Sequence, residues 1–215
     1  VLSFEATKDT TFEECQVVNV TPKVRLLRFA LIYGANASGK SNLLNAMDFL
    51  CGFWFDKKSD IDEETGVLPF LLDTETPNEP SEFNIKFFVD DKRYWYTLVL
   101  NDKQVIKENL YVYNSVQPSL VFSRELDGTA SLIKLNASLV KANATIVEQL
   151  NVKCLSNMSF FAARNQVNCS LAYIDEVRDW MKNNMMPIIE PGTRMFEYAG
   201  KQMEKNAELK AYILD

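Results

Sequence analysis

The residues best suited to chemistry form one short loop in the first fifth of this 215-residue chain. Gly34, Gly39, Lys40 and Ser41 stand at the spacing G-x-x-x-x-G-K-S, which is the phosphate-binding P-loop pattern. The glycines allow backbone conformations and a close approach that a Cβ atom would block. The loop amides can then surround phosphate oxygens at a helix N-terminus, where the dipole favours negative charge.

The pattern predicts a role for each residue of the loop. Lys40 is the expected catalytic cation, reaching the β- and γ-phosphates of ATP, and the Ser41 hydroxyl is the expected Mg²⁺ ligand. The predicted nucleotide-binding residues are Gly34, Ala35, Asn36, Ala37, Ser38, Gly39, Lys40, Ser41 and Asn42. The alternative interpretation is a glycine-rich turn before an ordinary helix.

A strand and a helix must flank such a loop. The run 29–33, Phe-Ala-Leu-Ile-Tyr, is continuously apolar and predicts a strand buried on both faces, as in a parallel sheet. Beyond the loop, Leu43, Leu44, Met47 and Leu50 recur at helical spacing and predict a helix that ends near residues 53–55. Other buried runs of this kind are few, so the parallel sheet is expected to be incomplete.

Composition narrows the class of protein. Hydrophobic residues make up 47% of the chain, enough for a sizeable core, and no apolar run has the length of a membrane helix. The net charge is −6 with no His, which excludes His-dependent nucleophilic catalysis and gives no overall basic field for nucleic acid. Four scattered cysteines suit a reducing cytoplasm.

The chain divides into three predicted parts. Residues 1–75 hold N-terminal strands (2–8 and 15–20), the P-loop and its helix. Apolar and polar residues then alternate with period two through 76–135, which predicts an antiparallel meander of four or five strands. Residues 136–215 are helical in period. The fold class is therefore α/β, a P-loop NTPase with an antiparallel β-meander and a helical segment, and 56–66 is expected to be an exposed, mobile loop.

The sequence around Asp175 and Glu176 resembles a Walker B strand, in which an acidic pair follows four apolar residues. The apolar positions continue at helical spacing through Val177, Trp180 and Met181, which favours a helix. On a helix the two carboxylates would be solvated side chains in its N-terminal half.

The chain resembles the N-terminal half of the bacterial AAA-type ATP-binding proteins of the abortive-infection and OLD class, whose heads are similar to ABC and SMC ATPases. The resemblance rests mainly on 27–44, which matches the P-loop of that family. Weaker matches follow at 69–70, 80–87, 94–98, 106–110 and 122–124.

The resemblance implies an ATPase that forms a homodimer around ATP and Mg²⁺, with a nuclease or toxin partner and a role in phage defence or DNA metabolism. It also implies a Q-loop, for which Gln166 and Gln149 are candidates; a surface Gln is the alternative for each. No signature motif or Walker B strand is recognisable, so the isolated chain is expected to lack turnover.

Two other functions fit the P-loop. A kinase acting on a small molecule or nucleotide would need an arginine-rich lid, and the dispersed candidates are Arg124, Arg164, Arg178 and Arg194. A nucleotide-holding module without turnover would bind its partner on the meander. Aromatic residues of the meander suggest a base-stacking platform, although strands favour aromatics in any case.

Overall fold

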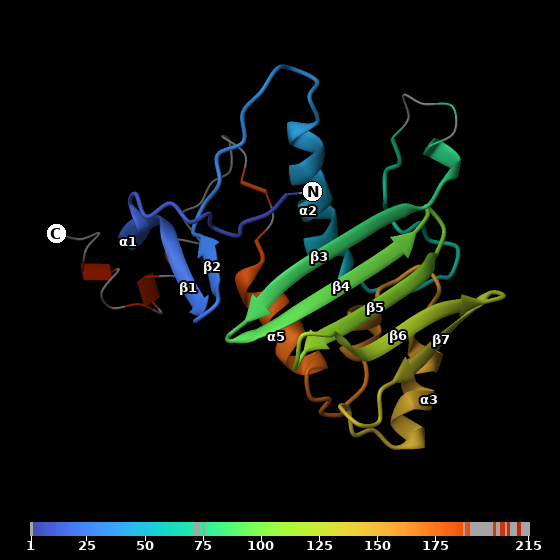
Figure 1. Ribbon diagram of the computed structural model, residues 1–215. Helices are drawn as coiled ribbons and strands as arrows, with labels where there is room; N and C mark the ends of the chain where they lie inside the picture. Colours follow the sequence, from blue (N-terminus) through green and yellow to red (C-terminus); the bar gives the residue numbers. More distant parts are fainter. Residues whose placement is uncertain are drawn as a thin grey trace.

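The computed structural model (Figure 1) describes residues 2–70, 74, 76–186, 188–189, 200, 203–204, 206 and 210–211. The helices are α1 (Glu13–Gln16), α2 (Lys40–Phe53), α3 (Ala144–Lys153), α4 (Phe160–Arg164) and α5 (Ile174–Asn184), with a 3-10 turn at Thr76–Asn78. The strands are β1 (Val17–Thr21), β2 (Val24–Leu27), β3 (Ser81–Val89), β4 (Lys92–Leu100), β5 (Val105–Tyr113), β6 (Ser119–Asp127) and β7 (Ala130–Leu135).

The centre of the fold is a five-stranded sheet in the order β3-β4-β5-β6-β7, with every neighbouring pair antiparallel. Strand follows strand through short turns, two of which use residues with positive φ, Asp90 at 52° and Gly128 at 62°, as tight hairpins require. The period-two pattern therefore predicted the meander correctly. The proposed division at residues 75 and 135 stays a prediction.

Helices cover one face of this sheet. In Figure 1 α2 and α5 lie behind the strands, and ring contacts fix both: Phe49 of α2 stacks on Phe83 of β3 with centroids 5.3 Å apart, and Trp180 of α5 stacks on Phe87 at 4.6 Å. Trp54, just after α2, meets Tyr96 edge to face. The apolar residues at alternate positions of the strands thus face the helices and form the core.

The N-terminal part differs from the prediction. Residues 2–8 make only an isolated bridge, Glu5 to Leu26, and the predicted strand at 15–20 begins as the short helix α1 before β1. The strand expected to reach residue 33 ends at Leu27, so 29–33 is irregular chain outside any sheet. All strand pairing in the described part of the chain is antiparallel, and no partner strand is there to bury this run.

The helical prediction for the C-terminal part holds for α3, α4 and α5. The further helices expected at 195–203 and 207–214 lie almost entirely outside the described residues. None of the described helices is long and apolar enough to cross a membrane.

The loop at 56–66 is mostly exposed, as expected, and hydrogen bonds hold it at several points, while its mobility stays a prediction. The Asn157 side chain donates hydrogen bonds to the carbonyl oxygens of Asp60 (2.8 Å) and Glu63 (2.7 Å). Thr65, only 3% exposed, donates its hydroxyl to the Asn101 carbonyl at 2.7 Å. Polar composition alone predicted exposure, but these three attachments come from distant parts of the chain.

A fully buried ion pair joins the sheet to the segment before α4. Arg124 of β6 lies 3.0 Å from Glu108 of β5, and both side chains are 0% exposed. The remaining guanidinium donors reach Ser131 and three backbone carbonyls, those of Leu155, Ser156 and Met158. The Glu108 carboxylate also accepts hydrogen bonds from the Tyr96 hydroxyl (3.0 Å) and the Phe160 N–H (2.8 Å).

The pair is satisfied on all sides, as buried charges must be. Burial raises the pKa of the Glu108 carboxyl, while Arg124, the Phe160 N–H and the Tyr96 hydroxyl oppose that rise. The network therefore fixes the segment 155–160 against the meander.

Cys154 lies buried beside this network, and burial raises the pKa of its thiol to about 11 from an ordinary value of 9.0. The thiolate is the nucleophile, so in the folded protein at pH 8 we expect iodoacetamide to alkylate the exposed Cys15 and to spare Cys154. Mass spectrometry of the peptides would show it, and equal labelling of both residues would contradict it. Because the folded-state pKa is the higher one, this thiol's contribution to stability is complete below pH 9 and is lost as the pH rises through about 11.

Candidate functional site

The loop 34–39 precedes α2 and forms the turn at the top of Figure 1. α2 begins at Lys40, and its N-cap Gly39 has φ 84°, a left-handed conformation that suits glycine. Gly39 offers no side-chain cap and the first turn holds no acidic residue. The positive end of the helix dipole therefore lacks a carboxylate of its own helix and favours an external anion.

The Lys40 ammonium folds back over the loop. Its Nζ donates hydrogen bonds to the carbonyl oxygens of Gly34 (3.0 Å) and Ala35 (2.6 Å) and to the Ser38 hydroxyl (3.3 Å). These three contacts use the three donors of an ammonium group. Lys40 thus links both ends of the loop at the N-terminus of α2.

The backbone of the loop explains its glycines only in part. A Cβ atom at Gly34 would lie 3.3 Å from the Ser38 hydroxyl oxygen, which is tight. Ala37 also adopts positive φ, at 62°, a conformation that costs a residue with a Cβ about 1–2 kcal/mol. The loop is therefore strained at Ala37, a position where the backbone conformation would suit a glycine.

The remaining predicted binding residues are open to solvent. All of Gly34 to Gly39 are exposed, as are Ser41 and Asn42 in the first turn of α2. Ser41 offers one hydroxyl oxygen, the hard ligand type that Mg²⁺ takes. The described residues contain no cluster of acidic, His or Cys side chains able to hold a metal. The fit to Mg²⁺ is thus one protein ligand, which suits an ion that keeps waters and is shared with phosphates.

Gln166 does not meet this loop in the described contacts. Its side chain is half-buried and its amide donates to the Ala162 carbonyl at 3.4 Å, within the α4 region. Ser159, the N-cap of α4, donates its hydroxyl to the Trp54 carbonyl at 2.8 Å, beyond the C-terminal end of α2. At 1.5 Å per residue, the 14 residues of α2 place that end about 20 Å from Lys40. The second candidate, Gln149, lies on α3.

Asp175 and Glu176 stand in the first turn of α5, so the helical interpretation of this stretch is confirmed. The expectation that both are merely solvated is wrong. Asp175 pairs with Arg164 at 2.8 Å and accepts the Leu171 N–H at 2.8 Å. Glu176 pairs with Lys92 at 2.9 Å, a contact that raises the pKa of Lys92. Asp175 therefore attaches α5 to the segment that precedes it, and Glu176 attaches α5 to β4.

Three of the four arginines considered for a kinase lid lie in the described part of the chain and pair with other residues. Arg124 is 0% exposed, in the pair with Glu108, and Arg164 is 3% exposed. Arg164 also donates to the carbonyls of Val167 and Cys169. Arg178 pairs with Asp175 and Asp179, and Arg194 lies outside the described residues. These contacts do not form a lid over the loop.

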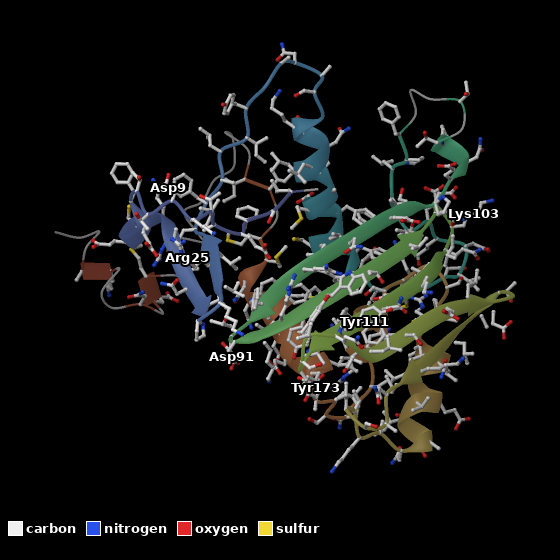
Figure 2. All side chains as sticks on the ribbon, viewed as in Figure 1. Asp9, Arg25, Asp91, Lys103, Tyr111 and Tyr173 are labelled. Carbon is white, nitrogen blue, oxygen red and sulfur yellow. The ribbon has the colours of Figure 1, made fainter. Side chains whose placement is uncertain are left out.

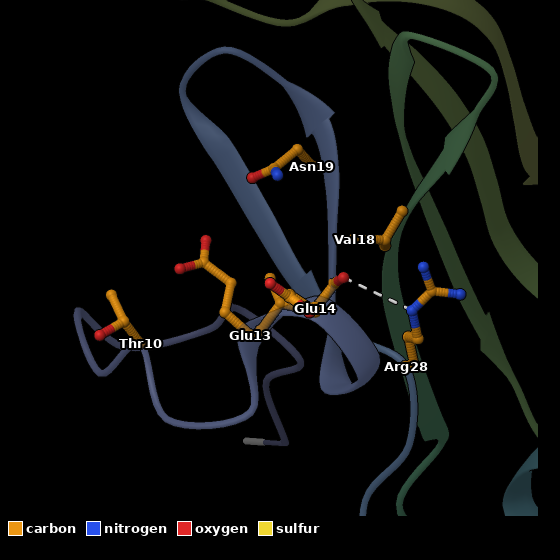
Figure 3. A pocket seen from close by; sticks show the side chains of 7 residues that line it. Thr10, Glu13, Glu14, Val18, Asn19 and Arg28 are labelled. Atoms are coloured by element: carbon orange, nitrogen blue, oxygen red, sulfur yellow. Dashed lines mark hydrogen bonds between the residues drawn. The ribbon is translucent and has the colours of Figure 1, made fainter.

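A separate hollow of about 510 Å³ lies at the β1–β2 hairpin (Figure 3). Its lining includes Glu13, Glu14 and Arg28, whose Nε donates to the Val17 carbonyl at 3.4 Å. None of the P-loop residues lines it. Two carboxylates beside one guanidinium make it a poor place for a triphosphate.

Sequence reasoning missed the contacts that hold α2 in place, above all the Ser159 hydroxyl on the Trp54 carbonyl. One local signal was available: a Ser directly before the apolar run 160–163 is a typical N-cap. Its bond to a residue 105 positions earlier has no sequence signature.

Residues 29–134 match the family described as "AAA domain, putative AbiEii toxin, Type IV TA system". The matched segment runs from the apolar stretch before the loop into β7. The match supports an AAA-type ATPase, hence a P-loop NTPase of the α/β class, and such domains generally bind ATP with Mg²⁺. No curated protein and no solved structure matches the chain.

Proposed function

We propose, from the AAA-type ATPase domain matched over 29–134, that this chain binds ATP with Mg²⁺ at the loop 34–42 and serves as an ATP-driven switch of the ABC/SMC-like type. The observation that carries the proposal is the Lys40 ammonium, held over the Gly34 and Ala35 carbonyls at the uncapped N-terminus of α2. A phosphate placed there would meet the helix dipole and the loop amides together.

Each residue has a defined part in the bound state. Lys40 would exchange its carbonyl acceptors for β- and γ-phosphate oxygens, which bear full charge and bind an ammonium more strongly. Ser41 would turn its exposed hydroxyl to Mg²⁺. The ion, when bound, would offset phosphate charge. Gly34 and Gly39 would let the backbone approach the phosphates closely.

Hydrolysis would need groups beyond those described. The acidic pair at Asp175 and Glu176 is engaged with Arg164 and Lys92, and the described residues hold no acidic cluster for a metal. A homodimer that completes each site, as the resemblance implies, would supply such groups. A role in phage defence or DNA metabolism, with a nuclease or toxin partner, belongs to the same proposal. The dispersal of Arg124, Arg164 and Arg178 gives no support to the kinase alternative.

Replacing Lys40 with Ala tests the site. Mg-ATP at a hundred times its Kd should stabilise the wild-type protein by about 2.7 kcal/mol, or roughly 5–10 °C in Tm for a chain of this size. We expect Lys40→Ala to lose most of that shift, measured for each variant against its own nucleotide-free Tm.

Lys57→Ala is the matched control, since Lys57 is an exposed cation beyond α2, and it should keep the full shift. A Lys40→Ala variant that also kept the full shift in Tm would contradict the assignment of Lys40 to phosphate binding. ATP turnover by the full-length homodimer, lost in Lys40→Ala, would separate a switch from a nucleotide-holding module.

A further inference from the structure

The face of the sheet turned away from α2 and α5 carries its own cluster of side chains. Strand register places Lys86, Trp95 and Tyr111 in one row across β3, β4 and β5, and Arg93 beside Tyr113 in the next. We call these five residues the aromatic face. Figure 2 shows side chains along this open side of the strands, with Tyr111 labelled among them. The structure separates them from Tyr94 and Tyr96, which are 0% exposed and belong to the core.

The side chains of the aromatic face form a ladder. The Trp95 and Tyr111 rings stack with centroids 4.8 Å apart. The Lys86 ammonium lies 5.1 Å from the Trp95 ring centroid, and the Arg93 guanidinium lies 4.9 Å from that of Tyr113. The Trp95 indole N–H donates to the Asn84 amide oxygen at 2.7 Å, which fixes the plane of the ring. Two cations and three aromatic rings are thus in contact across neighbouring strands of the sheet.

The charge of this face is locally positive although the chain as a whole carries −6. Lys86 and Arg93 are its cations, and these two rows contain no carboxylate. The nearest acids along the strands are Glu82, two residues before Asn84, and the turn residues Asp90 and Asp91. Lys107, further along the same face, is already neutralised by Glu125 at 3.3 Å.

We propose that the aromatic face binds single-stranded nucleic acid. Trp95, Tyr111 and Tyr113 would supply stacking surfaces that accept any base, and Lys86 and Arg93 would meet the phosphates. Lys86 is exposed, so its ammonium can leave the Trp95 ring for a phosphate oxygen and free that ring face for a base. The indole plane is already held by Asn84, so little ordering is left for the binding step.

Two other occupants fit this face less well. An apolar partner protein would bury the Lys86 ammonium and the Arg93 guanidinium without a counter-charge, which is costly. A second copy docked through the same face would bring these cations towards their own copies, because a two-fold interface places like patches together. A flexible anion with planar groups satisfies both the rings and the charges.

Fluorescence anisotropy with labelled 15-mers of oligo-dT and oligo-U, against a duplex of the same length, tests the proposal. We expect the full chain to prefer the single strands and Trp95→Ala to weaken their binding by roughly 5- to 150-fold, as the loss of one stacked base predicts. Lys86→Ala should lower the slope of log K against log salt by about 0.7, the value for one phosphate contact on a single strand.

Two control variants sharpen the experiment. Trp95→Phe should retain affinity within a few-fold while abolishing the fluorescence quenching that stacking on Trp95 produces. Lys134→Ala removes an exposed cation on β7, two strands beyond Tyr111, and should leave affinity unchanged. Lys40→Ala should also leave it unchanged, so failure here and failure of the ATP site remain distinguishable.

Three results would overturn the proposal: equal binding of duplex and single strand, no weakening in Trp95→Ala with its circular dichroism intact, or self-association through this face in sedimentation.

Discussion

Replacing Arg124 with Met is expected to lower the free energy of unfolding by about 3–5 kcal/mol, the cost of leaving one member of a buried ion pair without its partner. Glu108 would keep the Tyr96 hydroxyl and the Phe160 N–H but lose the cation that balances its charge. The carbonyls of Leu155 and Ser156 would lose a donor in the same step. Urea denaturation of the full chain measures the change.

The double variant Glu108→Gln, Arg124→Met should be destabilised by less than the sum of the two single changes, because neither leaves the other as an isolated charge. The control is Lys107→Ala, which breaks the neighbouring surface pair with Glu125, whose side chains are 48% and 57% exposed. Such pairs contribute at most about 1 kcal/mol. If Arg124→Met stayed within 1 kcal/mol of the wild type, the network would not stabilise the fold.

Asp175→Ala should be the second most damaging change, at about 2–4 kcal/mol. It removes the carboxylate that pairs with the almost fully buried Arg164 and accepts the Leu171 N–H, so the turn between α4 and α5 loses both attachments. Urea denaturation reports the total, and hydrogen exchange should rise first across 165–172. Asp179→Ala, on the same helix but 57% exposed, serves as the matched control and should change stability by less than about 0.5 kcal/mol.

A substitution of Asp175 also distinguishes an anchor of α5 from a Walker B carboxylate. As an anchor of α5, Asp175 should be replaceable by Asn without altering the affinity for Mg-ATP, even where stability falls. A Walker B carboxylate would show the opposite, with weaker Mg²⁺ dependence in a protein of unchanged stability. A lower affinity for Mg-ATP in Asp175→Asn would therefore refute the anchor role.

Local patterns predicted the parts of the fold that local physics decides. The alternation of apolar and polar residues predicted β3 to β7 because each strand has one face on the core. Helical spacing of apolar residues predicted α5, although Asp175 and Glu176 at its start resemble a Walker B strand. The P-loop spacing located the turn before α2, whose left-handed Gly39 it requires.

The misses have a common cause in contacts between distant residues. Glu108 and Arg124 stand where strand alternation calls for apolar side chains, which was a signal of burial, yet their pairing depends on the register of β5 against β6. An apolar run such as 29–33 forms a buried strand only if partner strands exist, and the sequence of the run carries no information about such partners. The split of the aromatic residues into core and open face likewise needed the register of β4.

The exposed apolar run 29–33 has a consequence for solubility. Its exposed fractions are 62% at Phe29, 82% at Leu31, 43% at Ile32 and 87% at Tyr33, and no hydrogen bond of its backbone amides is made within the described chain. An exposed, uncharged apolar run without proline can pair with the same run of another chain and aggregate in an amyloid-like way. We therefore expect a concentrated solution of the protein to aggregate through 29–33, the segment that leads into the phosphate-binding loop, and a partner strand that covered this run would also support that loop.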